Sequence, residues 1–146
     1  MMTILWVLGI GMILLWDVFW WLTGIKPIMP GTLKGILSED HKKVLLLDVR
    51  TPFEYHWFRI PNTTSQPTLL VNPKALPPTD PKRPIVVVCL SGHRSAVAAY
   101  RLRKLGFQNV SYLIGGMLAW LLSGGPTVRS SKNQQVGSEH LKDRRR

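Results

Sequence analysis

The sequence predicts an α/β domain with a mostly parallel central sheet, preceded by one transmembrane helix. Two apolar runs rich in β-branched residues or leucine, 44–49 and 84–88, predict buried strands. Residues 95–105 follow the second run and carry apolar residues at helical spacing, so strand and helix alternate as they do around a parallel sheet. The first 24 residues are almost wholly apolar and contain one charged side chain, Asp17.

The order of elements within the domain follows from turn residues and hydrophobic patterns. Residues 62–84 are rich in proline and threonine and contain one short apolar run, so we expect loops around a brief strand. The expected elements are a short helix at 33–37, strands at 44–49, 69–71, 86–88 and 110–114, and helices at 95–105 and 117–122.

Composition divides the chain of 146 residues into four segments. Residues 1–24 are expected to form the anchor, and residues 25–30, which contain prolines, a linker. Residues 31–123 leave about a hundred residues for one domain with a modest core. Residues 124–146 are polar and charged without periodicity, so we expect a basic, disordered tail.

The apolar N-terminal segment is long enough to cross a bilayer. At about 1.5 Å per residue, a helix of this length matches a hydrocarbon core of roughly 30 Å. A cleavable signal peptide is the alternative, but its basic n-region and small-residue cleavage site are not evident. Asp17 would cost about 3 kcal/mol at the bilayer centre. Trp16, Trp20 and Trp21 near one end and Trp6 near the other are distributed as aromatic belts are, which would place Asp17 near the headgroups.

Basic residues predict the orientation of the anchor. No lysine or arginine precedes the span, whereas Lys26, Lys34, Lys42 and Lys43 follow it, so the domain is expected to face the cytoplasm. The formal net charge of the chain is +11. Because no nucleic-acid-binding motif accompanies this charge, we expect contact with membrane lipid and not with nucleic acid. The oligomeric state stays open.

The only cysteine of the chain, Cys89, stands where a strand ends and a turn begins. A turn from strand to helix points backbone N–H groups at one place, and the positive end of the helix stabilises an anion. Arg94 adds a full charge, so a thiol held there should ionise more readily than a free one. A lone cysteine is most often a small buried hydrophobe. Such a cysteine does not require the glycine and arginine at Gly92 and Arg94, so we expect a nucleophile.

These residues resemble the rhodanese-like domains in their single-domain form. The resemblance covers roughly residues 31–123 and rests on the joint order and spacing of several motifs. It implies a three-layer α/β domain and a sulfurtransferase, whose cysteine accepts sulfane sulfur as a persulfide and passes it to a nucleophile. The motifs are Leu46-Leu47-Asp48-Val49-Arg50 with Glu54-Tyr55, Ile60-Pro61, Cys89-Leu90-Ser91-Gly92-His93-Arg94-Ser95, Leu105-Gly106-Phe107 with Asn109-Val110, and Gly115-Gly116 with Trp120.

The resemblance also implies roles for single residues and partners. Cys89 is expected to be catalytic, and Asp48 and Arg50 to support the site through an ion pair or hydrogen bonds. The expected partners are a small-molecule sulfur donor and a thiol acceptor or acceptor protein. With one cysteine and scattered histidines, we expect no metal and no other cofactor. The residues expected to bind substrate are Leu90, Ser91, Gly92, His93, Arg94 and Ser95.

Two other functions stay open at this point. A rhodanese-like interaction module held at the membrane would bind a protein or sense sulfur species without turnover. A cysteine phosphatase or arsenate reductase is less favoured, because cysteine phosphatases place five residues between cysteine and arginine. Only four residues intervene between Cys89 and Arg94, and the chain has no second cysteine to resolve an oxidised Cys89.

One segment departs from the family pattern. Many members read Gly-His-Ile-Pro-Gly-Ala where this chain reads Phe58-Arg59-Ile60-Pro61-Asn62-Thr63. Asn62 can adopt a left-handed backbone conformation, but Phe58 tolerates it poorly, so we expect the connection to follow a different path.

Overall fold

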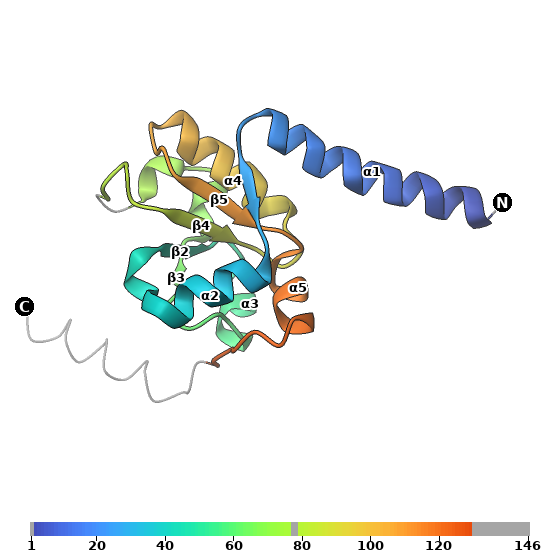
Figure 1. The fold of residues 1–146 in the computed structure, drawn as a ribbon. Helices are drawn as coiled ribbons and strands as arrows, with labels where there is room; N and C mark the ends of the chain where they lie inside the picture. The colour runs from blue at the N-terminus through green and yellow to red at the C-terminus, as the bar shows by residue number, and fades with distance from the viewer. Residues whose placement is uncertain (1, 77–78, 130–146) are drawn as a thin grey trace, which may run out of the picture.

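Five parallel strands form the central sheet, in the order β1-β5-β4-β2-β3 (Figure 1). This is a computed structural model, and it describes residues 2–76 and 79–129. The predicted α/β class with a parallel sheet is confirmed. The strands are β1 (Lys26–Ile28), β2 (Leu45–Asp48), β3 (Thr64–Ser65), β4 (Ile85–Val88) and β5 (Val110–Leu113). The helices are α1 (Met2–Leu22), α2 (Pro30–Asp40), α3 (Pro52–Trp57), α4 (His93–Lys104) and α5 (Gly116–Leu122), with short 3₁₀ helices η1 (His41–Lys43), η2 (Pro67–Leu70) and η3 (Pro73–Ala75).

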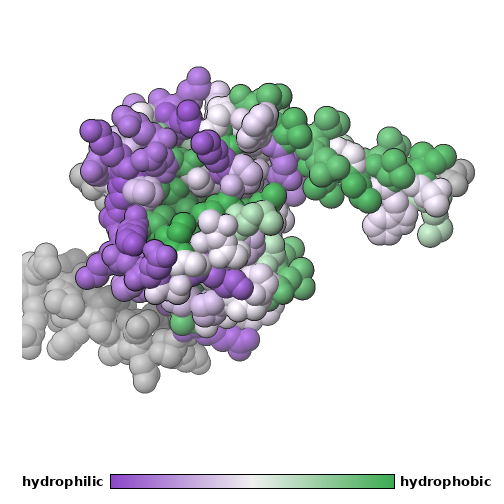
Figure 2. All heavy atoms as spheres, viewed as in Figure 1, coloured by the Kyte–Doolittle hydropathy of each residue, from purple (hydrophilic) through white to green (hydrophobic). Residues whose placement is uncertain are grey.

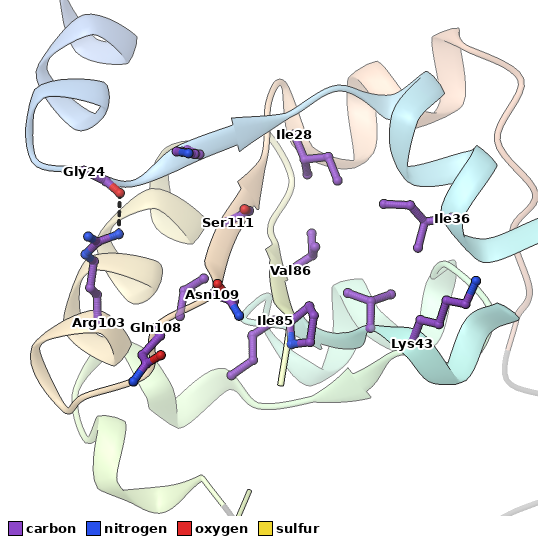
Figure 3. A pocket seen from close by; sticks show the side chains of 14 residues that line it. Gly24, Ile28, Ile36, Lys43, Ile85, Val86, Arg103, Gln108, Asn109 and Ser111 are labelled. Atoms are coloured by element: carbon purple, nitrogen blue, oxygen red, sulfur yellow. Dashed lines mark hydrogen bonds between the residues drawn. The ribbon is translucent and has the colours of Figure 1, made fainter. Parts of the chain in front are cut away.

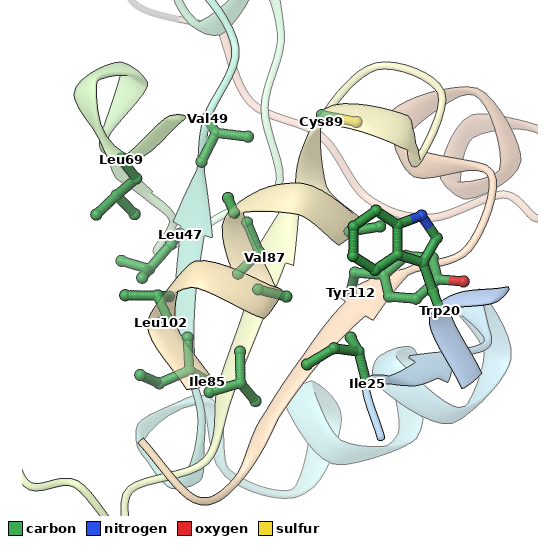
Figure 4. Close-up of a cluster of buried hydrophobic side chains, with 14 residues drawn as sticks. Trp20, Ile25, Leu47, Val49, Leu69, Ile85, Val87, Cys89, Leu102 and Tyr112 are labelled. Carbon is green, nitrogen blue, oxygen red and sulfur yellow. The ribbon is translucent and has the colours of Figure 1, made fainter. Parts of the chain in front are cut away.

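Helices cover both faces of the sheet, so the domain has three layers. Ile85 and Val87 of β4 belong to the core cluster on the α4 side (Figure 4). Val86 and Val88 belong to the second cluster, together with Trp120 of α5. A central strand covered on both faces needs apolar residues at every position, which is why β4 lacks polar alternation.

Local sequence signals place the two helices that flank the predicted site. The Thr51 side chain accepts a hydrogen bond from the Glu54 N–H, and Glu54 reaches back to the Thr51 backbone, so a capping box starts α3. Pro52 occupies its first turn. Gly92, with φ of 94°, precedes α4, and Gly106, with φ of 100°, follows its last turn.

Two expected segments differ from the structure. Residues 25–30 do not form a simple linker, because β1 lies within them and pairs with β5 along the edge of the sheet. The apolar run 69–71 is not a strand: Pro67 starts the 3₁₀ helix η2, and Leu69 is buried in the α4-side core. Tertiary contacts decide both cases, since neither run is long enough to show a period.

Two shorter segments bear on other expectations. Asn62 adopts the left-handed conformation, with φ of 61°, whereas Phe58 is extended.

The first residues of the expected tail pack on the domain: Val128 forms an antiparallel bridge with Arg59, and the Pro126 carbonyl accepts a hydrogen bond from the Trp120 indole. Residues 130–146, also expected to be disordered, lie outside the described residues.

The end of α1 packs against the domain. Trp20, expected in an aromatic belt, is only 7% exposed and joins the α4-side core with Tyr112 (Figure 4). Asp17, expected near headgroups, accepts a hydrogen bond of 2.9 Å from the Tyr112 hydroxyl. The rest of α1 projects from the domain with exposed apolar side chains (Figure 2). By length and composition, α1 is able to cross a membrane.

Candidate active site

Cys89 directly follows β4, at the carboxyl edge of the sheet. The short connection 89–92 leads from this strand into α4. Crevices at the carboxyl ends of parallel strands are where open α/β sheets bind their ligands. The structure places the expected substrate-binding residues at this edge, with residues 90–92 in the connection and residues 93–95 in the first turn of α4.

The Cys89 thiol is held by its own loop. The Gly92 N–H donates a hydrogen bond of 3.0 Å to Sγ, and Sγ lies 3.4 Å from the Ser95 hydroxyl. That hydroxyl in turn donates to the Gly92 carbonyl at 2.9 Å. Because an N–H at the start of a helix points at the sulfur, the loop is suited to stabilise negative charge there.

Cys89 itself is fully buried beneath the loop. Ser91 and His93 are exposed on its outer side, while Leu90 and Arg94 are half-buried. The sulfur therefore has no direct exposure to solvent in this arrangement.

The start of α5 holds the base of the cysteine loop. The Met117 N–H donates to the Cys89 carbonyl at 2.8 Å, and the Leu118 N–H donates to the Leu90 carbonyl at 3.1 Å. Gly116 makes this approach possible: a Cβ at that position would lie 2.4 Å from the Cys89 carbonyl oxygen. The Gly115-Gly116 motif thus acts on the site through close backbone packing.

Glu54 belongs to the site, although it was not among the expected site residues. Its carboxylate forms a two-point ion pair with Arg94, with Nη2–Oε1 at 2.8 Å and Nη1–Oε2 at 3.2 Å. The Arg94 hydrogen bonds lower the pKa of Glu54 to about 2, and those from Thr51 act in the same direction, against the effect of burial. The capping-box spacing from Thr51 to Glu54 is the sequence signal that marks this residue.

Replacing Glu54 with glutamine is expected to weaken the dependence of stability on acid pH. The pKa of Glu54 falls from 4.5 to about 2 on folding, so its contribution is complete above pH 4.5 and is lost as the pH falls toward 2. Glu54→Gln should therefore be less stable than the parent at pH 7, with a difference that shrinks between pH 4.5 and 2. Urea unfolding at several pH values measures this, with the exposed Glu39→Gln as the control; a constant difference would contradict the assignment.

Asp48 and Arg50 form a fully buried ion pair at the carboxyl end of β2. Arg50 Nη2 lies 2.7 Å from Asp48 Oδ2, and Nε donates to the same carboxylate at 3.0 Å. Arg50 also donates to the Phe58 carbonyl, which ties the departing segment to the sheet. Asp48 is paired in register with Val88, the residue before the cysteine, so this ion pair lies beside the site.

The domain also has a cavity that lies away from Cys89 and its loop. Its volume is about 640 Å³, and Lys26, Ile85 and Val110 line it at the amino ends of three strands. Figure 3 shows Ile85, Asn109 and Lys43 among the side chains around it. Since Cys89 follows the carboxyl end of β4, this cavity occupies the opposite edge of the sheet. Its size alone therefore does not identify it as the site.

Comparisons with known families and structures agree with this fold. A family model described as rhodanese-like domain matches residues 30–123. A rhodanese-like domain protein from Staphylococcus aureus is 31% identical, with a TM-score of 0.63, covering 73% of this chain and 100% of that one. The rhodanese-like domain of an Anabaena protein is 29% identical, with a TM-score of 0.64, covering 71% and 79%.

Relatives include proteins named for a reaction. An uncharacterized protein of Synechocystis is 38% identical over 109 residues, 75% of this chain, but the chain spans only 59% of that protein's length. A sulfurtransferase of Allochromatium vinosum is 37% identical over 89 residues, covering 61% of this chain and 82% of the relative. A mitochondrial thiosulfate sulfurtransferase of Saccharomyces cerevisiae is 28% identical over 114 residues, covering 68% and 75%.

Proposed function

Because the chain belongs to the rhodanese-like domain family, we propose that it is a sulfurtransferase in which Cys89 carries the sulfur. The observation that carries the proposal is the hydrogen bond from the Gly92 N–H to Cys89 Sγ, at the start of α4. Such a donor stabilises a thiolate before the reaction and a persulfide after it. The names of two relatives support the same reaction class.

The reaction proceeds in two displacements. The Cys89 thiolate attacks the sulfane sulfur of thiosulfate, the S–S bond of the donor breaks, and sulfite leaves with the bonding electrons. A thiolate acceptor then attacks the outer sulfur of the Cys89 persulfide and releases the Cys89 thiolate. The chain has one cysteine, so no internal disulfide can form. The sulfur on Cys89 must therefore leave to another molecule.

Arg94 is the proposed electrostatic partner of an anionic donor. Its guanidinium is half-buried and is held by Glu54, whose hydrogen bonds are the main cause of the raised pKa of Arg94. Glu54 balances the charge of this guanidinium, but the guanidinium has more N–H groups than the two that Glu54 accepts from, and these can donate to thiosulfate. We assign binding of the donor to this arginine and to the backbone of residues 90–95.

A binding module without turnover is the second candidate, and the complete burial of Cys89 is the observation that favours it. If the loop never opens, no donor reaches the sulfur, and the domain would act through its surface. Loading of Cys89 with sulfur distinguishes these two candidates directly.

We also infer that α1 anchors the domain in a bilayer. Its apolar side chains before Trp16 are mostly exposed, and burial of such a surface in lipid is favourable. Asp17 and Trp20 contact the domain, so the inserted part of the helix is residues 2–15. At about 1.5 Å per residue this part is about 21 Å long, so in this arrangement it enters a hydrocarbon core of roughly 30 Å without crossing it. Lysines that follow the helix favour the cytoplasmic side for the domain.

The proposed function is tested by the intact mass of the full chain in detergent micelles. After reduction and incubation with thiosulfate, the parent should gain one sulfur atom, which thiol or cyanide removes. Cys89→Ser should gain none, because it lacks the nucleophile. Absence of loading from both thiosulfate and glutathione persulfide would favour the binding module.

A further inference from the structure

A small cavity lies beside the cysteine loop, and α1 supplies one of its walls. Its volume is about 170 Å³. Ile13, Trp16 and Asp17 of α1 line it together with residues 91–93 of the loop and Tyr112 of β5. Gly92, which donates to Cys89 Sγ, is one of these lining residues, so the cavity directly adjoins the group that holds the sulfur. The apolar helix is therefore part of the surroundings of the active site.

Two polar groups in the cavity wall have unused hydrogen-bonding capacity. Asp17 Oδ1 accepts from the Tyr112 hydroxyl, and Oδ2 accepts no hydrogen bond from the residues that the structure describes. The Trp16 indole N–H is buried and also has no partner among them. Burial and the neighbouring carboxylate raise the pKa of Tyr112, which keeps its hydroxyl a donor to Asp17. The unpaired indole N–H is buried, whereas the second oxygen of the half-buried Asp17 is not, so that oxygen is open to a cationic ligand as it is to water.

The two flanks of the cysteine loop differ in charge. Arg94 is held by Glu54 of α3, which follows β2, whereas Asp17 is held by Tyr112 of β5. In the sheet, β2 and β5 lie on opposite sides of β4, the strand that ends at the cysteine. At the arginine flank, the Glu54 carboxylate balances the guanidinium, so this side carries no excess negative charge. At the other flank, the carboxylate repels anions and attracts cations within walls that include the Trp16 ring.

We propose that this cavity is the acceptor subsite of the sulfurtransferase and that it selects small aminothiols. Their ammonium group would pair with the free oxygen of Asp17 beside the Trp16 ring, leaving the thiol toward the cysteine loop. The inference rests on the proposed function. A cavity of this volume has room for about five waters, which suits a molecule of a few heavy atoms.

The transfer step balances without any further reactant. The aminothiol, as its thiolate RS⁻, attacks the outer sulfur of Cys89–S–SH. The new bond gives RS–SH, the S–S bond to the protein breaks, and the Cys89 thiolate leaves with its electron pair. Trp16 and Asp17 do not touch the reacting sulfur in this scheme and act as specificity residues.

The test is a single-turnover measurement on the full chain in detergent micelles. Cys89 is first loaded from thiosulfate, excess donor is removed, and loss of the persulfide is followed by quenched intact mass. The acceptors are cysteamine, 2-mercaptoethanol and 3-mercaptopropionate, which are cationic, neutral and anionic, compared at equal thiolate concentration. Asp17→Asn is the variant, because its amide oxygen still accepts from Tyr112, and the exposed Glu39→Gln is the charge-matched control.

The parent should favour cysteamine over 3-mercaptopropionate, and Asp17→Asn should lower that ratio by about tenfold, as expected for loss of one nearby charge in a partly screened site. The rate with 2-mercaptoethanol should change by less than about twofold, and Glu39→Gln should match the parent, since exposed distant charges are screened. An unchanged ratio, or an equal loss with all three acceptors, would overturn the subsite. Failure of the parent to load from both thiosulfate and glutathione persulfide would overturn the proposed function, and the subsite with it.

Discussion

Asp48→Ala is expected to lower the free energy of unfolding by about 3–5 kcal/mol, because it leaves a buried guanidinium without its counter-ion. Both Asp48 and Arg50 are fully buried, and the carboxylate accepts hydrogen bonds from Nε and Nη2 of Arg50. It also accepts from the Arg50 backbone N–H at 3.0 Å, which shapes the turn after β2. All these interactions would be lost together in Asp48→Ala. The loss would destabilise β2, the strand that pairs with β4 beside Cys89.

Urea unfolding of the full chain in mild detergent, followed by tryptophan fluorescence, measures this loss. The matched control is Glu39→Ala, which removes the exposed ion pair between Glu39 and Lys43, with N–O at 3.3 Å. Exposed pairs of this kind contribute about 0.3–0.5 kcal/mol. If the two variants were destabilised equally, the buried ion pair would contribute no more to the free energy of unfolding than the exposed one, and the prediction would be wrong.

Gly116→Ala is expected to slow sulfur loading at least about tenfold and to destabilise the domain by about 2–4 kcal/mol. Its φ is +56°, which an L side chain rarely adopts, and its Cβ would lie 2.4 Å from the Cys89 carbonyl oxygen and 2.6 Å from the Leu90 carbonyl. The α5 helix would have to move away from the loop. That movement would break the Met117 and Leu118 hydrogen bonds that hold the base of the loop.

The rate of persulfide formation from thiosulfate, with the urea midpoint of the same samples, tests both parts. Gly35→Ala is the matched control, because an added Cβ on α2 meets nothing within 4 Å. Alanine is favoured over glycine inside a helix by up to about 1 kcal/mol, so this control should be as stable as the parent or more stable. A normal loading rate in Gly116→Ala would show that the α5 contact does not position Cys89.

Local sequence was sufficient to predict an element wherever its residue pattern lies within one short segment. The run of β-branched residues predicted β4, and the helical spacing after Gly92 predicted α4, although the helix begins two residues earlier, at His93. The carboxyl-edge position of Cys89 followed from those two elements. The spacing from Cys89 to Arg94 identified the loop, since loop length is a property of the chain alone.

Contacts between residues far apart in the sequence could not be predicted from local patterns. Arg94 meets Glu54 across 40 positions, and Tyr112 meets Asp17 across 95. β1 has three residues, one of them proline, and becomes a strand only because β5 offers an unpaired edge. Trp20 was expected in an aromatic belt at the membrane interface but lies in the core of the domain. A tryptophan in either place can have the same neighbours in the sequence, so local patterns do not distinguish the two.

The α/β class, the parallel sheet, the apolar N-terminal helix and the cysteine loop at the end of β4 could therefore be predicted from local sequence. Those features depend on hydrophobic period, β-branching and turn residues, which act over a few neighbouring positions. Three features are seen only in the folded domain: Glu54 pairs with Arg94, α5 hydrogen-bonds to the cysteine loop, and α1 lines a cavity beside that loop. These contacts depend on how elements far apart in the chain pack around one sheet, and that packing is set by the whole core.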